Sequence, residues 1–294
     1  MDARSIAATA VNKGFLTSAE NIDVDFTKPK YFFNKSVYDN RVYQGFGKAD
    51  TSVELKLGPN ITDWPEMVAL PENLLVKVVS LITDPVTTTD ELIPSGETSS
   101  YRSNPLGLAE FTLSRKDPAY VGRAKEVQVA EKAIEAGNCP SQAFPEVKPI
   151  MDTIKTKFTI SRDVMGIGST IFAVKPGDGS AREQAASCQK VLGGWANIAR
   201  EYATKRYRSN LINWGMLPFI FDEENLPFEN GDYVFIPQVA QGIKDKKSEF
   251  TAYVVRNGEM KEFTLKMGEL TDDEREIILA GCLINYNRNK NKNK

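Results

Sequence analysis

The sequence of 294 residues contains no histidine. This absence excludes a Ser-His-Asp or Cys-His catalytic triad formed within the chain, and it excludes histidine ligands for zinc or iron. Any proton transfer by this chain must therefore use a carboxylate, a lysine, a tyrosine, a cysteine or an activated serine.

Cysteines, excess charge of one sign and long apolar runs are also scarce. The three cysteines, Cys139, Cys188 and Cys282, include no C-x-x-C pair, so no metal site is expected in this chain and a reducing, cytoplasmic location is predicted. The 37 basic and 39 acidic residues give a net charge of −2, which favours neither nucleic acid nor an anionic membrane as a partner. No apolar run reaches the roughly 20 residues that a membrane-spanning helix needs.

The residues that are present predict an α/β fold with a mixed sheet. Apolar runs rich in β-branched and aromatic residues indicate strands, and helical periodicity indicates helices. Strands are predicted over 74–82, 169–175, 217–221, 232–237, 249–255 and 259–265. Helices are predicted over 1–15, 124–137, 183–192, 198–213 and 271–286, and a long polar loop over 87–105.

A glycine-rich turn, GDGSAREQAA at 177–186, joins a predicted strand to a predicted helix. Such a junction favours anions, because backbone N–H groups and the helix dipole both attract negative charge. The turn lacks the lysine of a Walker loop, the third glycine of a dinucleotide fingerprint and the G-x-S-x-G of a hydrolase elbow. Ser180, at a positive helix end and two positions before Arg182, is suited to act as a base without the help of a histidine. Arg182 could equally bind the carboxylate of a substrate. The alternative is that Ser180 only caps the helix.

Residues 177–221 resemble the C-terminal swivel domain of the aconitase family. That family carries a G-S-S-R-E-H-A-A turn, then L-G-G-R/K-A, then an N-L…G-L-L-P-L/F segment, and this sequence has similar residues in the same order. Residues 88–104, TTDELIPSGETSSYRSN, resemble the family's T-T-D-H-I…F-R-G loop, and residues 1–23 resemble the last helix of its iron–sulfur domains.

The resemblance implies four parts and a three-layer β/β/α arrangement with a mixed sheet. Residues 1–26 correspond to a terminal remnant of the iron–sulfur-binding domains, 27–52 to an extended linker, and 53–286 to the swivel domain. Residues 287–294, which are rich in asparagine and lysine, are predicted to form a disordered polar tail.

The resemblance also implies a chemistry. Ser180 matches the family's catalytic base, which takes a proton from the carbon next to a carboxylate. The positions that match substrate-binding or neighbouring residues are Arg182, Arg102, Asp90 and Gly179. The implied substrate is a di- or tricarboxylic hydroxy acid.

The family's [4Fe–4S] cluster acts as a Lewis acid on the departing hydroxyl. Its cysteine ligands and the remaining acid/base residues are expected outside this chain, in N-terminal iron–sulfur domains of the same polypeptide or in a large subunit. The predicted function is therefore the C-terminal part of an aconitase-like hydro-lyase, inactive as this chain alone and without metal ligands of its own.

Three residues depart from the family pattern. Ala181 replaces the second serine, Glu91 replaces the histidine of T-T-D-H, and Gln184 replaces the histidine after S-R-E. These departures leave open which hydroxy acid is the substrate. They also leave an alternative, a non-catalytic binding or regulatory module with RNA as one possible ligand. The basic run 204–210 suggests RNA, but the net charge of −2 favours a solvated helix face or a domain contact.

Overall fold

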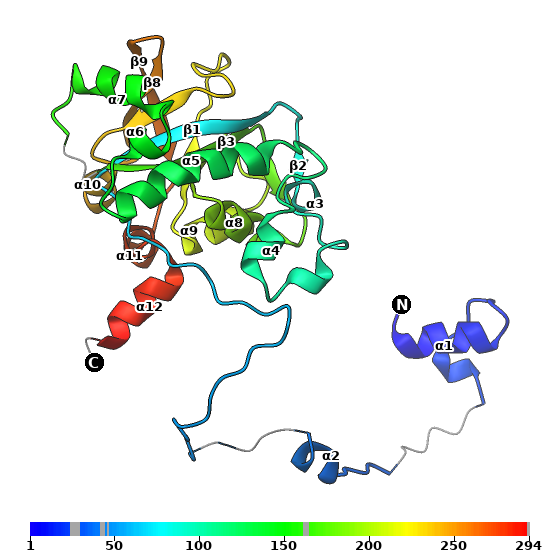
Figure 1. Ribbon diagram of the computed structural model, residues 1–294. Helices are drawn as coiled ribbons and strands as arrows, with labels where there is room; N and C mark the ends of the chain where they lie inside the picture. The colour runs from blue at the N-terminus through cyan, green and yellow to red at the C-terminus, as the bar shows by residue number, and fades with distance from the viewer. Residues whose placement is uncertain (24–29, 42–44, 46, 161–164, 293–294) are drawn as a thin grey trace. The chain divides into compact units, whose positions relative to one another are not determined.

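The computed structural model describes residues 1–23, 30–41, 45, 47–160 and 165–292, and it divides into two compact units (Figure 1). The first unit is Met1–Lys56 and the second is Leu57–Lys294. Parts of the predicted linker 27–52, and the ends of the segments 1–26 and 287–294, lie outside the described residues. In the described part of the chain, no helix combines the length and the apolar character needed to span a membrane.

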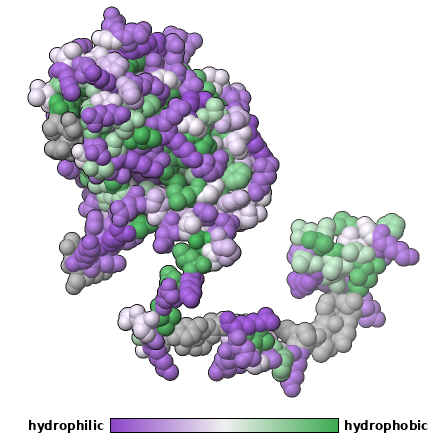
Figure 2. Space-filling view, viewed as in Figure 1, coloured by the Kyte–Doolittle hydropathy of each residue, from purple (hydrophilic) through white to green (hydrophobic). Residues whose placement is uncertain are grey.

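The first unit begins with helix α1, Ala3–Val11, which is capped by Asp2 through hydrogen bonds accepted from the N–H groups of Arg4 and Ser5. A 3₁₀ turn, Ala19–Asn21, and the short helix α2, Ser36–Asp39, follow. Large apolar side chains of this unit are exposed, and Figure 2 shows hydrophobic residues gathered on the surface around α1. The most exposed are Met1, Leu16, Tyr31, Phe32 and Leu55.

The second unit is built on a closed barrel of seven strands in the order β1-β3-β5-β6-β9-β8-β7. The pairs β1-β3, β3-β5 and β5-β6 are parallel, and the other four pairs around the barrel are antiparallel, so the predicted mixed sheet is confirmed. The strands are β1 Asn73–Ile82, β3 Met165–Ala173, β5 Gly194–Ala199, β6 Leu217–Ile220, β7 Tyr233–Ile236, β8 Glu249–Arg256 and β9 Glu259–Met267.

Helices cover the parallel side of the barrel. Figure 1 shows α5 lying along β1 and β3, and α8 and α9 make the crossovers that parallel neighbours require. The helices of this unit that follow the 87–104 loop are α4 Pro105–Ala109, α5 Tyr120–Glu135, α6 Pro140–Ala143, α7 Val147–Lys155, α8 Arg182–Val191, α9 Lys205–Asn213, α10 Val239–Lys244, α11 Asp272–Ala280 and α12 Leu283–Lys292.

Two apolar clusters hold these elements together, and alternate residues of β1 contribute to each. Leu74, Val76 and Val78 belong to the cluster shared with β6 to β9, whereas Leu75 and Val79 belong to the cluster under α5 and α8. Both faces of β1 are therefore buried, as expected for a strand with a parallel neighbour and helices above it. The α/β class is confirmed, but the strand order describes a closed barrel and not three separate layers.

Four predicted elements differ from the structure. The predicted loop 87–105 contains the short strand β2, Thr87–Thr88, the short helix α3, Thr89–Leu92, and a 3₁₀ turn, Ser99–Tyr101. The helix predicted over 198–213 begins only at Lys205, because residues 194–199 form the buried strand β5 between β3 and β6. The helix predicted over 271–286 is two helices, since Gly281 adopts a left-handed φ of 88°. Residues 287–292, predicted to be disordered, continue helix α12, where Lys290 pairs with Asp273.

A buried acid and a buried base lie between α5 and α8 and make the stability of this unit depend on pH. Burial raises the pKa of Glu131 from 4.5 to about 7, although the hydrogen bond that its carboxylate accepts from the Ile167 N–H at 2.6 Å lowers this pKa in part. Burial likewise lowers the pKa of Lys190 from 10.5 to about 8, although Glu131 opposes the shift. The folded state thus binds more protons than the unfolded state at Glu131, and fewer at Lys190.

We expect Glu131 to reduce the free energy of unfolding as the pH rises from about 4.5 to about 7, and Lys190 to increase it between about 8 and 10.5. Glu131→Gln keeps an acceptor for the Ile167 N–H and removes the acid. Urea denaturation of this variant and the wild type at a series of pH values should show the variant gaining relative stability between about pH 4.5 and 7, with a constant difference above pH 7. A pH-independent difference would contradict the assignment.

Candidate functional site

A two-stranded sheet brings together two segments that lie far apart in the sequence. Strand β2, Thr87–Thr88, pairs in parallel with β4, Pro176–Asp178. The short helix α3, Thr89–Leu92, follows β2 directly and contacts both β4 and α8. The predicted loop and the predicted serine turn therefore lie side by side in the fold.

Positions 177 and 179 of the turn require glycine, because other side chains lie too close to their Cα atoms for a Cβ. Gly177 has a φ of 96°, and a Cβ there would lie 2.3 Å from the buried ring of Tyr207 on α9. Gly179 has a φ of 135°, and a Cβ there would lie 2.1 Å from the hydroxyl of Thr89. Backbone geometry at these positions thus allows α3 and α9 to pack directly against the turn.

Ser180 is exposed at the entrance to α8. The N-cap of this helix is Ala181, and within the part of the chain that the structure describes no side chain makes a capping hydrogen bond at this helix start. Ser180 therefore does not cap the helix, contrary to the alternative prediction. Among the described residues its hydroxyl has no hydrogen-bond partner, so the oxygen is available to a ligand beside a positive helix end.

Arg182 is the first residue of α8 and is half-buried. Its Nε is buried and has no hydrogen-bond partner in the described part of the chain. A buried donor without an acceptor is costly, so an acceptor brought by a ligand would stabilise this arrangement. Glu183, the next residue, is held by the Trp214 indole N–H at 3.0 Å.

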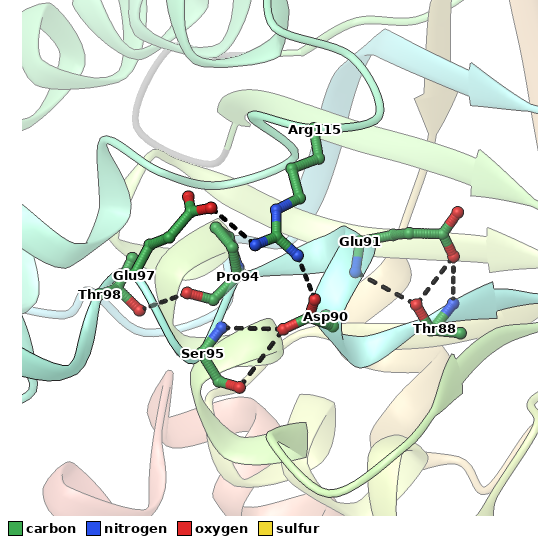
Figure 3. Close-up of polar contacts among 8 residues, drawn as sticks. All are labelled: Thr88, Asp90, Glu91, Pro94, Ser95, Glu97, Thr98 and Arg115. Atoms are coloured by element: carbon green, nitrogen blue, oxygen red, sulfur yellow. Dashed lines mark hydrogen bonds and ion pairs between the residues drawn. The ribbon is translucent and has the colours of Figure 1, made fainter.

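Asp90 lies on α3 within a network of charged and polar groups (Figure 3). Its carboxylate pairs with Arg115 and accepts hydrogen bonds from the N–H of Ser95 at 3.1 Å and from its hydroxyl at 3.3 Å. Arg115 also pairs with Glu97 at 2.7 Å. Arg115 was not predicted as a site residue, because nothing in a single sequence connects it to Asp90, 25 residues earlier.

Glu91, which replaces a histidine of the family pattern, has a local role. It forms a capping box with Thr88, accepting the Thr88 N–H at 2.7 Å and the Thr88 hydroxyl at 2.9 Å. Burial alone would raise the pKa of Glu91, but these hydrogen bonds and Lys116 outweigh it, so that the pKa is lowered. The T-x-x-E spacing is the sequence signal that could have revealed this cap.

The structure does not connect Arg102 to the other predicted residues. Arg102 is exposed directly after the 3₁₀ turn η2, Ser99–Tyr101, and forms no hydrogen bond or ion pair with any residue that the structure describes. It precedes α4 by three positions, and α4 packs against α8. The predicted residues that are brought together are thus Ser180, Arg182, Gly179 and, through α3, Asp90.

The cysteines of this chain do not fit an iron–sulfur cluster. Cys139 precedes α6, Cys188 lies on α8 and Cys282 separates α11 from α12. Burial raises the pKa of the Cys188 thiol to about 12, whereas cluster ligation requires thiolates. No group of three or more potential metal ligands occurs among the described residues.

The basic run 204–210 and Arg200 make internal contacts. Arg200 donates to the carbonyl of Glu224 at 2.6 Å, and Arg208 donates to the carbonyl of Glu269 at 2.6 Å. These guanidinium groups fasten loops to the barrel, which favours the prediction of a contact within the fold over a nucleic-acid surface.

Residues 129–224 match the family model of the aconitase C-terminal domain. A protein described as aconitate hydratase A, from Rickettsia bellii, is 32% identical over 126 residues, covering 41% of this chain and 14% of that protein. A protein described as methanogen homoaconitase small subunit, from Methanocaldococcus jannaschii, is 36% identical over 110 residues, covering 37% of this chain and 55% of that protein. The crystal structure of a 3-isopropylmalate dehydratase from the same organism is 22% identical, with a TM-score of 0.45, over 75% of this chain and 96% of that one.

Proposed function

We propose, from the match of residues 129–224 to the family model of the aconitase C-terminal domain, that this chain is the swivel component of an aconitase-type hydro-lyase. The proposed substrate is a di- or tricarboxylic hydroxy acid. The observation that carries the proposal is the exposed Ser180 hydroxyl at an uncapped helix start, two positions before Arg182, whose buried Nε has no partner among the described residues either.

In this proposal Ser180 Oγ takes the proton from the carbon next to a substrate carboxylate. The N-terminal N–H groups of α8 and the positive charge of Arg182 stabilise the serine oxygen as an alkoxide, which replaces the missing histidine. Arg182 also binds the carboxylate, for which its planar fork is suited, and Arg102 is proposed as a second carboxylate ligand.

A partner is needed for the remaining chemistry, because the cysteines described above do not fit a cluster. We assign the [4Fe–4S] cluster to iron–sulfur domains on the same polypeptide or on a large subunit, with residues 1–26 as their terminal part and 27–52 as a linker. The exposed apolar residues of the first unit support this, since a surface of that kind usually contacts another protein. We also propose that the protein is located in the cytoplasm.

The test is co-expression with a candidate iron–sulfur partner from the source genome, followed by anaerobic purification. We expect a stable complex that dehydrates a hydroxy acid, measured by the ultraviolet absorption of the unsaturated product. The proposal would be refuted by a cluster-loaded complex that is inactive on every di- and tricarboxylic hydroxy acid tested.

Arg182→Lys is expected to lower kcat/KM of this complex by about tenfold or more, because an ammonium cannot reproduce a bidentate guanidinium contact. Steady-state kinetics against the wild type measure the loss. Arg206→Lys on the exposed face of α9 is the matched control and should be neutral. Unchanged kinetics in Arg182→Lys would leave Arg182 with a structural role only.

A further inference from the structure

The turn that follows α4 is attached to the barrel on one side. Asp117 accepts a hydrogen bond from the hydroxyl of Ser80 on β1 at 2.6 Å and pairs with Arg123. Arg123 in turn donates to the carbonyl of Val79 at 2.7 Å. This side of the turn therefore moves with strand β1.

The other side of the same turn holds α3. The N–H of Leu113 donates to the carbonyl of Leu92, the last residue of α3, at 2.8 Å. Leu113 is fully buried and has a φ of 55°, a left-handed conformation that a leucine adopts only when its surroundings impose it. Strain of this kind is typical of segments that are held in place for a function.

Two adjacent basic residues, Arg115 and Lys116, form ion pairs that attach residues 84–97 to the same turn. Arg115 pairs with Asp90 and Glu97, as described above. Lys116 pairs with Asp84 at 2.8 Å and with Glu91 at 3.3 Å. Each base thus bridges two acids, and together they fasten residues 84–97 at four points.

We propose that Arg115 and Lys116 are positioning residues, a clamp that sets α3, and through α3 the Ser180 turn, relative to the barrel. The connection runs through Thr89, whose hydroxyl occupies the space that a side chain at position 179 would need. Asp90 acts through this clamp and is not a substrate ligand. The expected effect on turnover rests on the proposed function, whereas the effect of the clamp on the position of α3 and of the Ser180 turn does not.

The clamp is suited to position the loop more than to stabilise the fold. The side chains of Arg115 and Asp90 are 45% and 51% exposed, and ion pairs at such exposure contribute little to global stability. A small displacement of a catalytic oxygen, by contrast, reduces turnover strongly. Loss of the clamp should therefore separate activity from stability.

The first experiment is hydrogen–deuterium exchange on the full chain, without partner or substrate. In Arg115→Met we expect residues 88–98 and 179–184 to exchange roughly threefold to thirtyfold faster, while the barrel strands and the melting temperature stay unchanged. Lys125→Met is the matched control, because Lys125 on α5 forms a similarly exposed pair with Glu110. Arg115→Lys should give an intermediate result, since an ammonium keeps the charge but lacks the two separate nitrogens with which the guanidinium contacts Asp90 and Glu97.

Unchanged exchange in both segments of Arg115→Met would overturn the proposal. Faster exchange in 88–98 alone would also overturn it, because the clamp would then not reach the Ser180 turn. Neither outcome depends on whether the chain belongs to a hydro-lyase.

In the complete enzyme, Arg115→Met should lower kcat by about tenfold or more with a smaller change in KM. Asp90→Asn should give a similar loss, and the double variant should be no worse than either single variant, because the two residues act as one unit. Additive losses would place Asp90 on the substrate and refute its role in the clamp.

Discussion

Ser180→Ala in the complete enzyme is expected to lower kcat by about 10²- to 10⁴-fold, the usual contribution of a general base. The chain has no histidine that could take over, and the serine hydroxyl has no hydrogen-bond partner among the described residues that its loss would leave unsatisfied. The fold should therefore be unaffected, and substrate binding should persist through the arginines.

The measurement is steady-state kinetics together with the melting temperature and the cluster absorbance of the complex. Ser248→Ala is the matched control, because Ser248 is also exposed and its side chain forms no hydrogen bond in the described structure. Full turnover in Ser180→Ala, with the cluster intact, would show that another group is the base.

Gly177→Ala is expected to destabilise the second unit by roughly 3 to 5 kcal/mol, the combined result of overpacking and of a strained backbone. The added Cβ would meet the ring of Tyr207, which is fully buried. That ring has little room to move, because its hydroxyl accepts hydrogen bonds from Gln189 at 2.9 Å and from Asn197 at 2.8 Å.

Urea denaturation of the full chain measures the effect. Gly122→Ala provides a control with the opposite sign, since Gly122 lies on the exposed side of α5 with no atom within 4 Å of an added Cβ. It should gain about 0.5 to 1 kcal/mol from the higher helix propensity of alanine. Equal stability of the two variants would mean that the contact between the turn and α9 is looser than described.

Most strands were predictable because each combines β-branched or aromatic residues with a clear boundary. The sequence between β8 and β9, Arg-Asn-Gly at 256–258, marks such a boundary: Asn257 and Gly258 adopt φ values of 51° and 79°, as a tight hairpin turn requires. Strand β5 was missed for a physical reason. The run GWANIA is buried on both faces, so it lacks the alternation that distinguishes a strand from a buried helix.

The site was predictable only in part. Ser180, Gly179 and Arg182 are adjacent in sequence, so local pattern and family resemblance sufficed to select them. The contacts of Asp90 with Arg115 and of Gly179 with Thr89 depend on tertiary packing. No local rule connects residues so far apart, and these are the contacts that decide how the turn is held.

The closure of the barrel has a consequence for how the chain acquires its structure. Leu74 on β1 pairs with Ile236 on β7, so the pairing that closes the barrel joins residues 236 − 74 = 162 positions apart. Contacts of such long range slow folding, because the loop must be ordered before the contact stabilises it. During synthesis, the edge of β1 that pairs with β7 stays unpaired until β7 has left the ribosome. We expect the nascent chain to be most prone to aggregation in that interval.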